Sequence, residues 1–124
     1  MKTTISFITT LLITLTLQAQ NVDFKAGNFK EDKEGLKAAL EQIDAGDAKL
    51  KEVEEAIKNN KDTKQYYAVA LEAYLRANKF NPNNAELNYK IGKCYLNLYE
   101  KSKSLDYLKK AVELDPELNK EMYL

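Results

Sequence analysis

The stretch that decides the fold runs from residue 85 to residue 116 and reads AELNYKIGKCYLNLYEKSKSLDYLKKAVELDP. In its first half Ile91 and Tyr95 are four residues apart, which puts them on one face of a helix. Its second half carries another apolar stripe with helical spacing, which ends at Pro116 because proline cannot continue a helix. Gly92 leaves room for a second backbone to approach closely. The stretch therefore predicts two antiparallel helices, a helical hairpin.

The same pattern recurs upstream at an interval of 34 residues, so we expect an all-α fold of helical-hairpin repeats, about two of them plus the start of a third. The leading helix of the first hairpin does not align at this interval. If Gly46 has the role of Gly92, that helix is longer by about three turns. An alternative alignment, with Ile57 in the role of Tyr95, stays open. The pairs at the 34-residue interval are Ala70 and Ser104, Tyr74 and Leu108, Ala77 and Ala111, and Pro82 and Pro116.

The hairpin of residues 85–116 resembles the tetratricopeptide repeat, whose pattern combines large, small and proline residues at fixed positions. One position departs from it. Asn88 stands where that family prefers a large apolar residue, which predicts looser packing at the start of the helix. The resemblance implies a binding scaffold. The residues that match the pattern are Ile91, Gly92, Tyr95, Ser104, Leu108, Ala111 and Pro116.

The whole chain is also similar to the N-terminal region of bacterial envelope proteins of the OmpA family. In that architecture a signal peptide precedes tetratricopeptide repeats, a propeller-like region and an OmpA-like domain, and the last two are absent from this sequence. The resemblance implies a place in the periplasm or at the outer membrane. It rests on the junction Leu17-Gln18-Ala19-Gln20, on the lengthened first hairpin, and on residues 81–87, NPNNAEL.

The first residues have the order typical of a secretory signal peptide, with Lys2 followed by an apolar run and then by Ala19. The apolar run, from residue 5 to residue 17, is shorter than the roughly 20 residues that a membrane-spanning helix needs. The predicted organisation is a signal peptide at 1–19, an extended lead-in at 20–31, a lengthened hairpin at 32–84, a second hairpin at 85–118, and the start of a truncated third repeat at 119–124.

Charge and residue inventory disfavour several kinds of site. The chain has 19 basic and 19 acidic residues, and this balance disfavours nucleic acid as a partner. It has no histidine and one cysteine, Cys94, which removes histidine-based catalysis, zinc sites and an internal disulfide. We interpret Cys94 as a core residue, because free cysteine is among the most buried residue types. We expect no enzymatic activity, no catalytic residue, no cofactor and no metal.

The hypothesis for function is an exported scaffold, the N-terminal module of a larger OmpA-like protein, that binds a protein or peptide in its concave groove. The alternative is a purely structural spacer that joins envelope-anchoring domains and has no groove ligand. Membrane or cell-wall association would come only through regions missing from this chain. First helices of such repeats line the concave face, and an ordinary solvated face is the competing interpretation of their exposed residues. The candidate partner-binding residues are Tyr89, Lys93, Leu96 and Asn97.

The sequence after Pro116 reads ELNKEMYL, and Met122 follows Asn88 by 34 residues. This spacing predicts that a third repeat begins here. We then expect the last hairpin to lack a neighbour on the face formed by Tyr107, Leu114 and Leu118. Solenoid repeats bury their faces on their neighbours, so the isolated chain is expected to be marginally stable or to self-associate.

Overall fold

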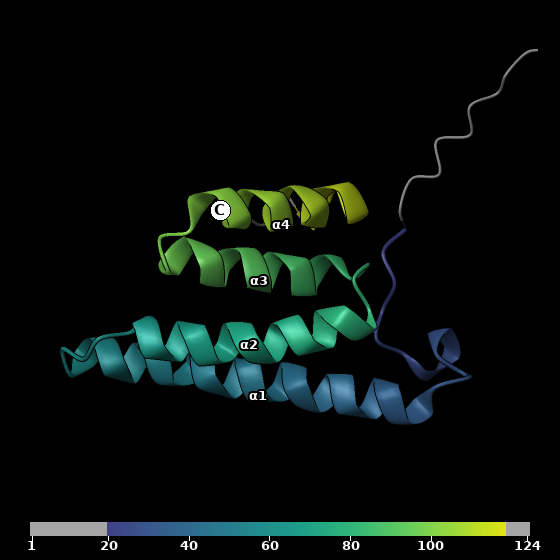
Figure 1. The fold of residues 1–124 in the computed structure, drawn as a ribbon, viewed down its shortest axis with the longest axis horizontal. Coiled ribbons are helices and arrows are strands. Elements are labelled where there is room, and N and C mark those ends of the chain that lie inside the picture. The colour runs from purple at the N-terminus through teal and green to yellow at the C-terminus, as the bar shows by residue number, and fades with distance from the viewer. Residues whose placement is uncertain (1–19, 119–124) are drawn as a thin grey trace, which may run out of the picture.

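The computed structural model describes residues 20–118. A short 3₁₀ helix, Ala26–Asn28, precedes four α-helices, and these residues contain no strand. Figure 1 shows the helices side by side in chain order, α1 with α2 and α3 with α4 as antiparallel hairpins. The predicted all-α helical-hairpin fold is confirmed. The helices are α1 (Lys33–Lys58), α2 (Lys64–Phe80), α3 (Ala85–Asn97) and α4 (Lys101–Leu114).

Two leading helices begin at side-chain caps, and two trailing helices end just before proline. The Asp32 carboxylate accepts a hydrogen bond from the backbone N–H of Gly35 at 2.7 Å at the start of α1. The Asn84 side chain does the same for the N–H of Leu87 at 2.9 Å at the start of α3. Such caps satisfy N–H groups that have no partner within the helix.

The predicted signal peptide at 1–19 and third repeat at 119–124 lie outside the described residues.

The core lies where α1, α2 and α3 meet, and it is built from alanines and a few large side chains. Tyr74 is fully buried at its centre. Asn88 is also fully buried, and its amide donates to the carbonyl oxygens of Pro82 and Asn84 at 3.0 and 2.8 Å. The looser packing predicted at Asn88 is therefore wrong, because the amide replaces apolar packing with hydrogen bonds to the preceding turn. The buried cluster comprises Ala39, Ala70, Leu71, Tyr74, Ala77, Leu87, Ile91 and Cys94.

The two helices of each hairpin pack closely through the same kind of contact, in which a glycine of the leading helix lies against a large side chain of the trailing helix. A Cβ atom added to Gly46 would lie 2.4 Å from a ring carbon of Tyr74. One added to Gly92 would lie 2.7 Å from the side chain of Leu108. Gly46 thus has the role of Gly92, so equivalent residues are 46 apart in the leading helices and 34 apart in the trailing ones. The alternative with Ile57 fails, since that side chain is 60% exposed.

The expectation for the last hairpin's open face is partly wrong. Leu114 is only 6% exposed, and the ring of Tyr107 stacks on that of Tyr95 in α3, with centroids 5.6 Å apart. Tyr107 therefore faces α3, and Leu114 is covered. Leu118 is half-buried. The exposed apolar residue of α4 is Leu105, which lies on the opposite side of the helix from Tyr107 and Leu114.

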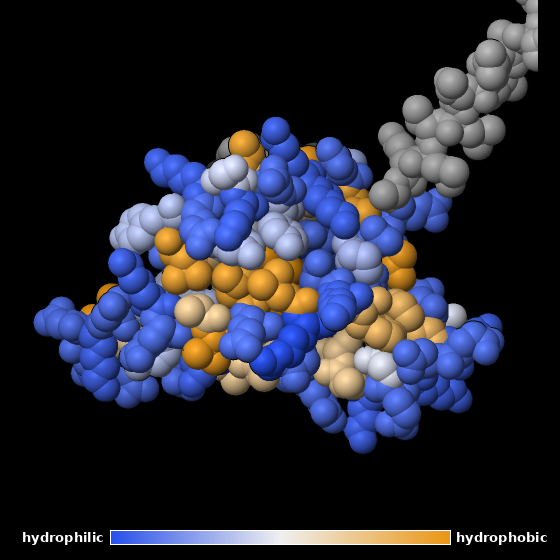
Figure 2. Space-filling model, in the orientation of Figure 1, coloured by the Kyte–Doolittle hydropathy of each residue, from blue (hydrophilic) through white to orange (hydrophobic). Residues whose placement is uncertain are grey.

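Apolar side chains also reach the surface where the two hairpins meet, as the band in Figure 2 shows. In the described part of the chain no helix combines the length and the apolar character needed to cross a bilayer.

Candidate functional site

The outward face of α3 carries the four residues that the sequence indicates for partner binding. Tyr89 is half-buried, Lys93 and Asn97 are exposed, and Leu96 is 43% exposed. Their spacing places them on one side of the helix, opposite the buried Ile91 and the other core residues of α3. The Asn97 side chain turns back onto α3 and donates to the carbonyl of Lys93 at 2.8 Å. This leaves Tyr89, Lys93 and Leu96 as the side chains free to contact a ligand.

Two hollows lie beside the N-terminal half of α3, and they share Glu86 and Lys90. The first, of about 200 Å³, lies between the lead-in, α1 and α3. The second, of about 530 Å³, extends toward the end of α4 and includes Tyr89 in its wall. The candidate face and the hollows therefore form one continuous surface. The first hollow is lined by Phe24, Leu40, Ile43, Asn84, Glu86, Leu87 and Lys90, and the second by Asn21, Asp23, Ala85, Glu86, Tyr89, Lys90, Asp115 and Leu118.

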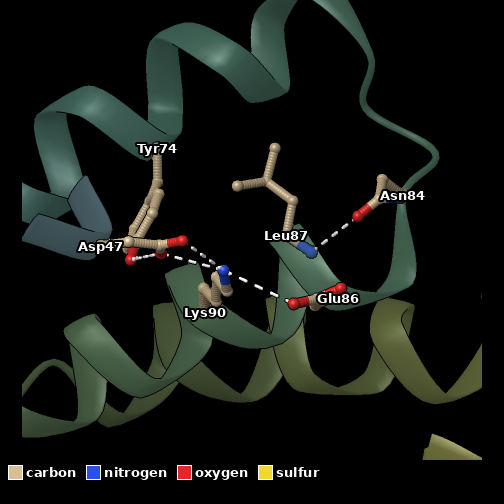
Figure 3. A network of polar contacts seen from close by, with 6 residues as sticks. All are labelled: Asp47, Tyr74, Asn84, Glu86, Leu87 and Lys90. Atoms are coloured by element: carbon tan, nitrogen blue, oxygen red, sulfur yellow. Dashed lines mark hydrogen bonds and ion pairs between the residues drawn. The ribbon is translucent and has the colours of Figure 1, made fainter. Parts of the chain in front are cut away.

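A polar network joins three helices at the edge of this surface (Figure 3). The Lys90 ammonium lies 2.9 and 3.1 Å from the two carboxylate oxygens of Asp47 in α1. The Tyr74 hydroxyl in α2 donates to the same carboxylate at 2.5 Å. Glu86, one turn before Lys90, adds a second carboxylate at 3.5 Å. The network fixes Lys90 between the hollows, so its ammonium is already paired before any ligand arrives.

The environment of Tyr74 keeps its hydroxyl protonated. Burial is the main cause that raises the pKa of Tyr74 well above its ordinary value, and the hydrogen bond to Asp47 and its negative charge raise it further. The Lys90 ammonium also lies 5.8 Å from the centre of the Tyr74 ring. Tyr74 therefore acts as a fixed hydrogen-bond donor that orients Asp47.

Sequence reasoning missed this network. Asp47 and Lys90 stand 43 residues apart, and each looks like one of many charged residues on a solvated helix face. The available signal was Gly46: its pairing with Tyr74 puts the next residue, Asp47, close to that tyrosine's hydroxyl.

The lead-in is tied to the turn between the hairpins by what we call the asparagine clasp, the side chains of Asn81 and Asn84. Both amides donate to the carbonyl oxygen of Val22, at 2.8 and 3.1 Å. The Val22 N–H donates to the carbonyl of Asn83 at 2.7 Å. The asparagine-rich segment thus has a local role: it holds the lead-in along one wall of both hollows.

Cys94 is a core residue, as predicted. Its side chain is fully buried, and burial raises the pKa of its thiol to about 12. A thiol with so high a pKa is a poor nucleophile near neutral pH, since the thiolate is the reactive form. Within the described residues no group of three or more histidine, cysteine, aspartate or glutamate side chains is placed to hold a metal ion.

The family is decided by residues 50–122, which match the family model described as regulator of microtubule dynamics protein 1-3. The chain belongs to the regulator of microtubule dynamics family. The matched residues make up more than half of the chain and include α2, α3, α4 and all four residues of the candidate face. Comparisons with curated proteins and with solved structures gave no match.

Membership of the regulator of microtubule dynamics family corrects the resemblance drawn from the sequence. Assignment to the tetratricopeptide and OmpA families is wrong. So are the functions drawn from it, an exported envelope scaffold or an envelope spacer, and the periplasmic or outer-membrane location. The physical reason is that Gly92, Tyr95 and Ala111 record the close packing of two helices. Stacked hairpins of different families need small and aromatic residues at the same points.

Proposed function

We propose that this chain is a non-enzymatic module that acts in the regulation of microtubule dynamics by binding a protein or peptide on the face of α3. The observation that carries the proposal is the family match over residues 50–122, since the family is described as regulators of microtubule dynamics. That stretch contains the whole candidate face, formed by Tyr89, Lys93, Leu96 and Asn97.

The character of the face supports a protein ligand. Leu96 and Tyr89 offer apolar and aromatic contact, and Lys93 supplies a charge at the border, a combination typical of protein interfaces. The hollow of about 530 Å³ beside Tyr89 can receive a side chain of the ligand. The balanced charge of 19 basic and 19 acidic residues favours a protein over a nucleic acid.

The non-enzymatic part of the proposal is supported by the state of the candidate reactive groups. Cys94 is buried with a raised pKa, and Tyr74 is committed to Asp47 as a hydrogen-bond donor. Lys90 is paired with the same carboxylate. The raised pKa values of Cys94 and Tyr74 disfavour proton transfer or nucleophilic attack by these two groups at neutral pH, and the ammonium of Lys90 is held in an ion pair.

Co-sedimentation with polymerised tubulin, together with the rate of tubulin assembly followed by turbidity, tests the proposal. We expect the chain to pellet with microtubules, either alone or with a partner from the same cell, and to change the assembly rate. Leu96→Ser and Lys93→Glu should weaken both effects. The matched controls are Val69→Ser on α2, 51% exposed, and Lys37→Glu on α1, also exposed.

Two results would contradict the proposal. The first is a chain that neither pellets nor alters assembly, with or without cell extract. The second is an effect that Val69→Ser and Lys37→Glu reduce as much as Leu96→Ser and Lys93→Glu, because the face of α3 would then have no special part in it.

A further inference from the structure

The outer side of α4 presents an apolar stripe whose counterpart in the first hairpin is covered. Leu105 is 51% exposed, whereas Leu71, its equivalent 34 residues earlier in α2, is 9% exposed. Val112 continues the stripe and is half-buried, while Leu108, between them, packs against Gly92 of α3. Among the described helices α4 packs extensively only against α3. The trailing helices of the two hairpins thus have the same kind of face. Within the described residues α3 covers the face of α2, and no helix covers the face of α4 in the same way.

The first hairpin shows what kind of element such a face receives. Leu71 lies in one buried cluster with Leu87, Ile91 and Cys94 of α3. These three residues stand at positions i, i+4 and i+7 of that helix. A helix with apolar residues at this spacing therefore fits the equivalent face of α4, because both faces are built at the same interval from the same small and large residues.

The charge at the edge of the face is reversed between the two hairpins. In the first hairpin Asp47 pairs with Lys90, which stands at position i+3 of the covering helix. The residue equivalent to Asp47, 46 positions later, is Lys93. Lys101 and Lys109 flank Leu105 at one turn on either side, and none of these three lysines has an ion-pair partner among the described residues. A helix that covers this face should therefore carry a carboxylate where α3 carries Lys90.

Helix α1 of a second copy of this chain does not supply this pattern. In α1 of a second copy the equivalent of Leu87 is Glu41, and the next two positions are the alanines 45 and 48. All three side chains are exposed. A charged residue followed by alanines would bury little apolar area on the stripe.

We infer that the outer side of α4, with Lys93 at its edge, is a docking surface for an acidic amphipathic helix of another protein. The helix has apolar residues at i, i+4 and i+7 and a carboxylate at i+3. Apart from Lys93, this surface is separate from the face of α3, and the inference does not rest on the proposed function. Lys93 lies where the two surfaces meet.

Binding of two synthetic peptides to the full chain, measured by fluorescence anisotropy, tests the inference. Both are alanine-based helices of about 18 residues, long enough to populate a helix in water, with Leu, Ile and Leu at i, i+4 and i+7. One carries Glu at i+3 and the other carries Lys. We expect the Glu peptide to bind about fivefold more tightly. The order should reverse for the Lys93→Glu chain. Leu105→Asp should abolish binding of both peptides, while Val69→Asp, at an equally exposed position on α2, should not.

Three outcomes would overturn the inference: equal binding of the two peptides, a preference that Lys93→Glu leaves unchanged, or binding that survives Leu105→Asp. Sedimentation of the chain alone provides a fourth. Self-association that Leu105→Asp removes would assign the face to a second copy instead. Since no tubulin is present, these results are independent of the test of the proposed function.

Discussion

The ammonium of Lys90 spans both carboxylate oxygens of Asp47, at 2.9 and 3.1 Å, and so joins the leading helices of the two hairpins. The side chains are 24% and 39% exposed, which places the pair between a surface and a buried ion pair. Tyr74 donates to the same carboxylate. Asp47 therefore has two partners from two other helices, and its loss affects both.

A double-mutant cycle on Asp47→Asn and Lys90→Met, followed by urea denaturation, measures this link. We expect a coupling of about 0.5–1 kcal/mol, reduced by high salt because both groups remain partly in water. Asp47→Asn alone should cost more than Lys90→Met, since it weakens the bond to Tyr74 as well. The control is the exposed pair Lys49–Glu52 within α1. A coupling free energy no larger than that of the control pair would show that the Asp47–Lys90 pair stabilises the fold no more than an exposed ion pair does.

Substitution of the close-packed glycines should overpack the hairpins. Gly46→Leu and Gly92→Leu are each expected to lower the free energy of unfolding by about 1–3 kcal/mol, since the new side chain meets Tyr74 or Leu108. Thermal denaturation by circular dichroism gives the measurement. Gly27→Leu is the matched control, because nothing lies within 4 Å of a Cβ added there. If all three variants melt alike, the equivalence of Gly46 and Gly92 is mistaken.

The asparagine clasp should hold the lead-in on the hairpins. Asn84→Ala removes both the cap on the N–H of Leu87 and one bond to Val22, at an expected cost of about 1–2 kcal/mol. Hydrogen exchange of the Val22 amide should also become faster. In Asn83→Ala the partner of Val22 is a backbone carbonyl, which the substitution keeps, so that variant should behave as wild type. Unchanged exchange in Asn84→Ala would mean that the clasp does not hold the lead-in.

The buried thiol makes stability depend on pH in the alkaline range. The folded-state pKa of Cys94 is raised by burial from 9.0 to about 12. The unfolded chain releases this proton at lower pH than the folded chain, so the stabilisation is complete below pH 9 and is lost as the pH rises from 9 to 12. The loss amounts to at most about 1.4 kcal/mol per pH unit.

The Cys94→Ala variant isolates this effect from the other groups that titrate at high pH. Urea denaturation at several values between pH 8 and pH 11 should show the stability gap between wild type and Cys94→Ala narrowing as the pH rises. A gap that stays constant over that range would indicate a thiol that is not shielded from water in the folded state.

The fold could be predicted because its main signals are local or repeat at a fixed interval. Pro82 and Pro116 mark helix ends, and the pairing of Tyr74 with Leu108 gives the register of the trailing helices. The turn after α3 was harder to predict from the sequence, because Tyr99 adopts a φ of 62° at a position where glycine or asparagine is usual. The lead-in, for which the sequence predicts an extended conformation, contains the 3₁₀ helix Ala26–Asn28.

The candidate face could be placed on α3, because helical spacing alone separates Tyr89 and Lys93 from the core stripe. The network that supports it could not, since the contact between Asp47 and Lys90 depends on how two helices are positioned across α2. The family was misjudged for a related reason: packing residues such as Gly92 record the geometry of a hairpin and carry little information about descent.

The asparagine clasp also determines where a pull on the chain would be felt. Asn21 and Val22 bond to residues 81–85 at the turn between α2 and α3, and the long helix α1 begins only at Lys33. Tension applied through the leading segment would therefore load the junction between the two hairpins before it reached α1. Asn84 lines the smaller hollow and Asn21 the larger one, so a displacement of this segment would change the walls of both hollows.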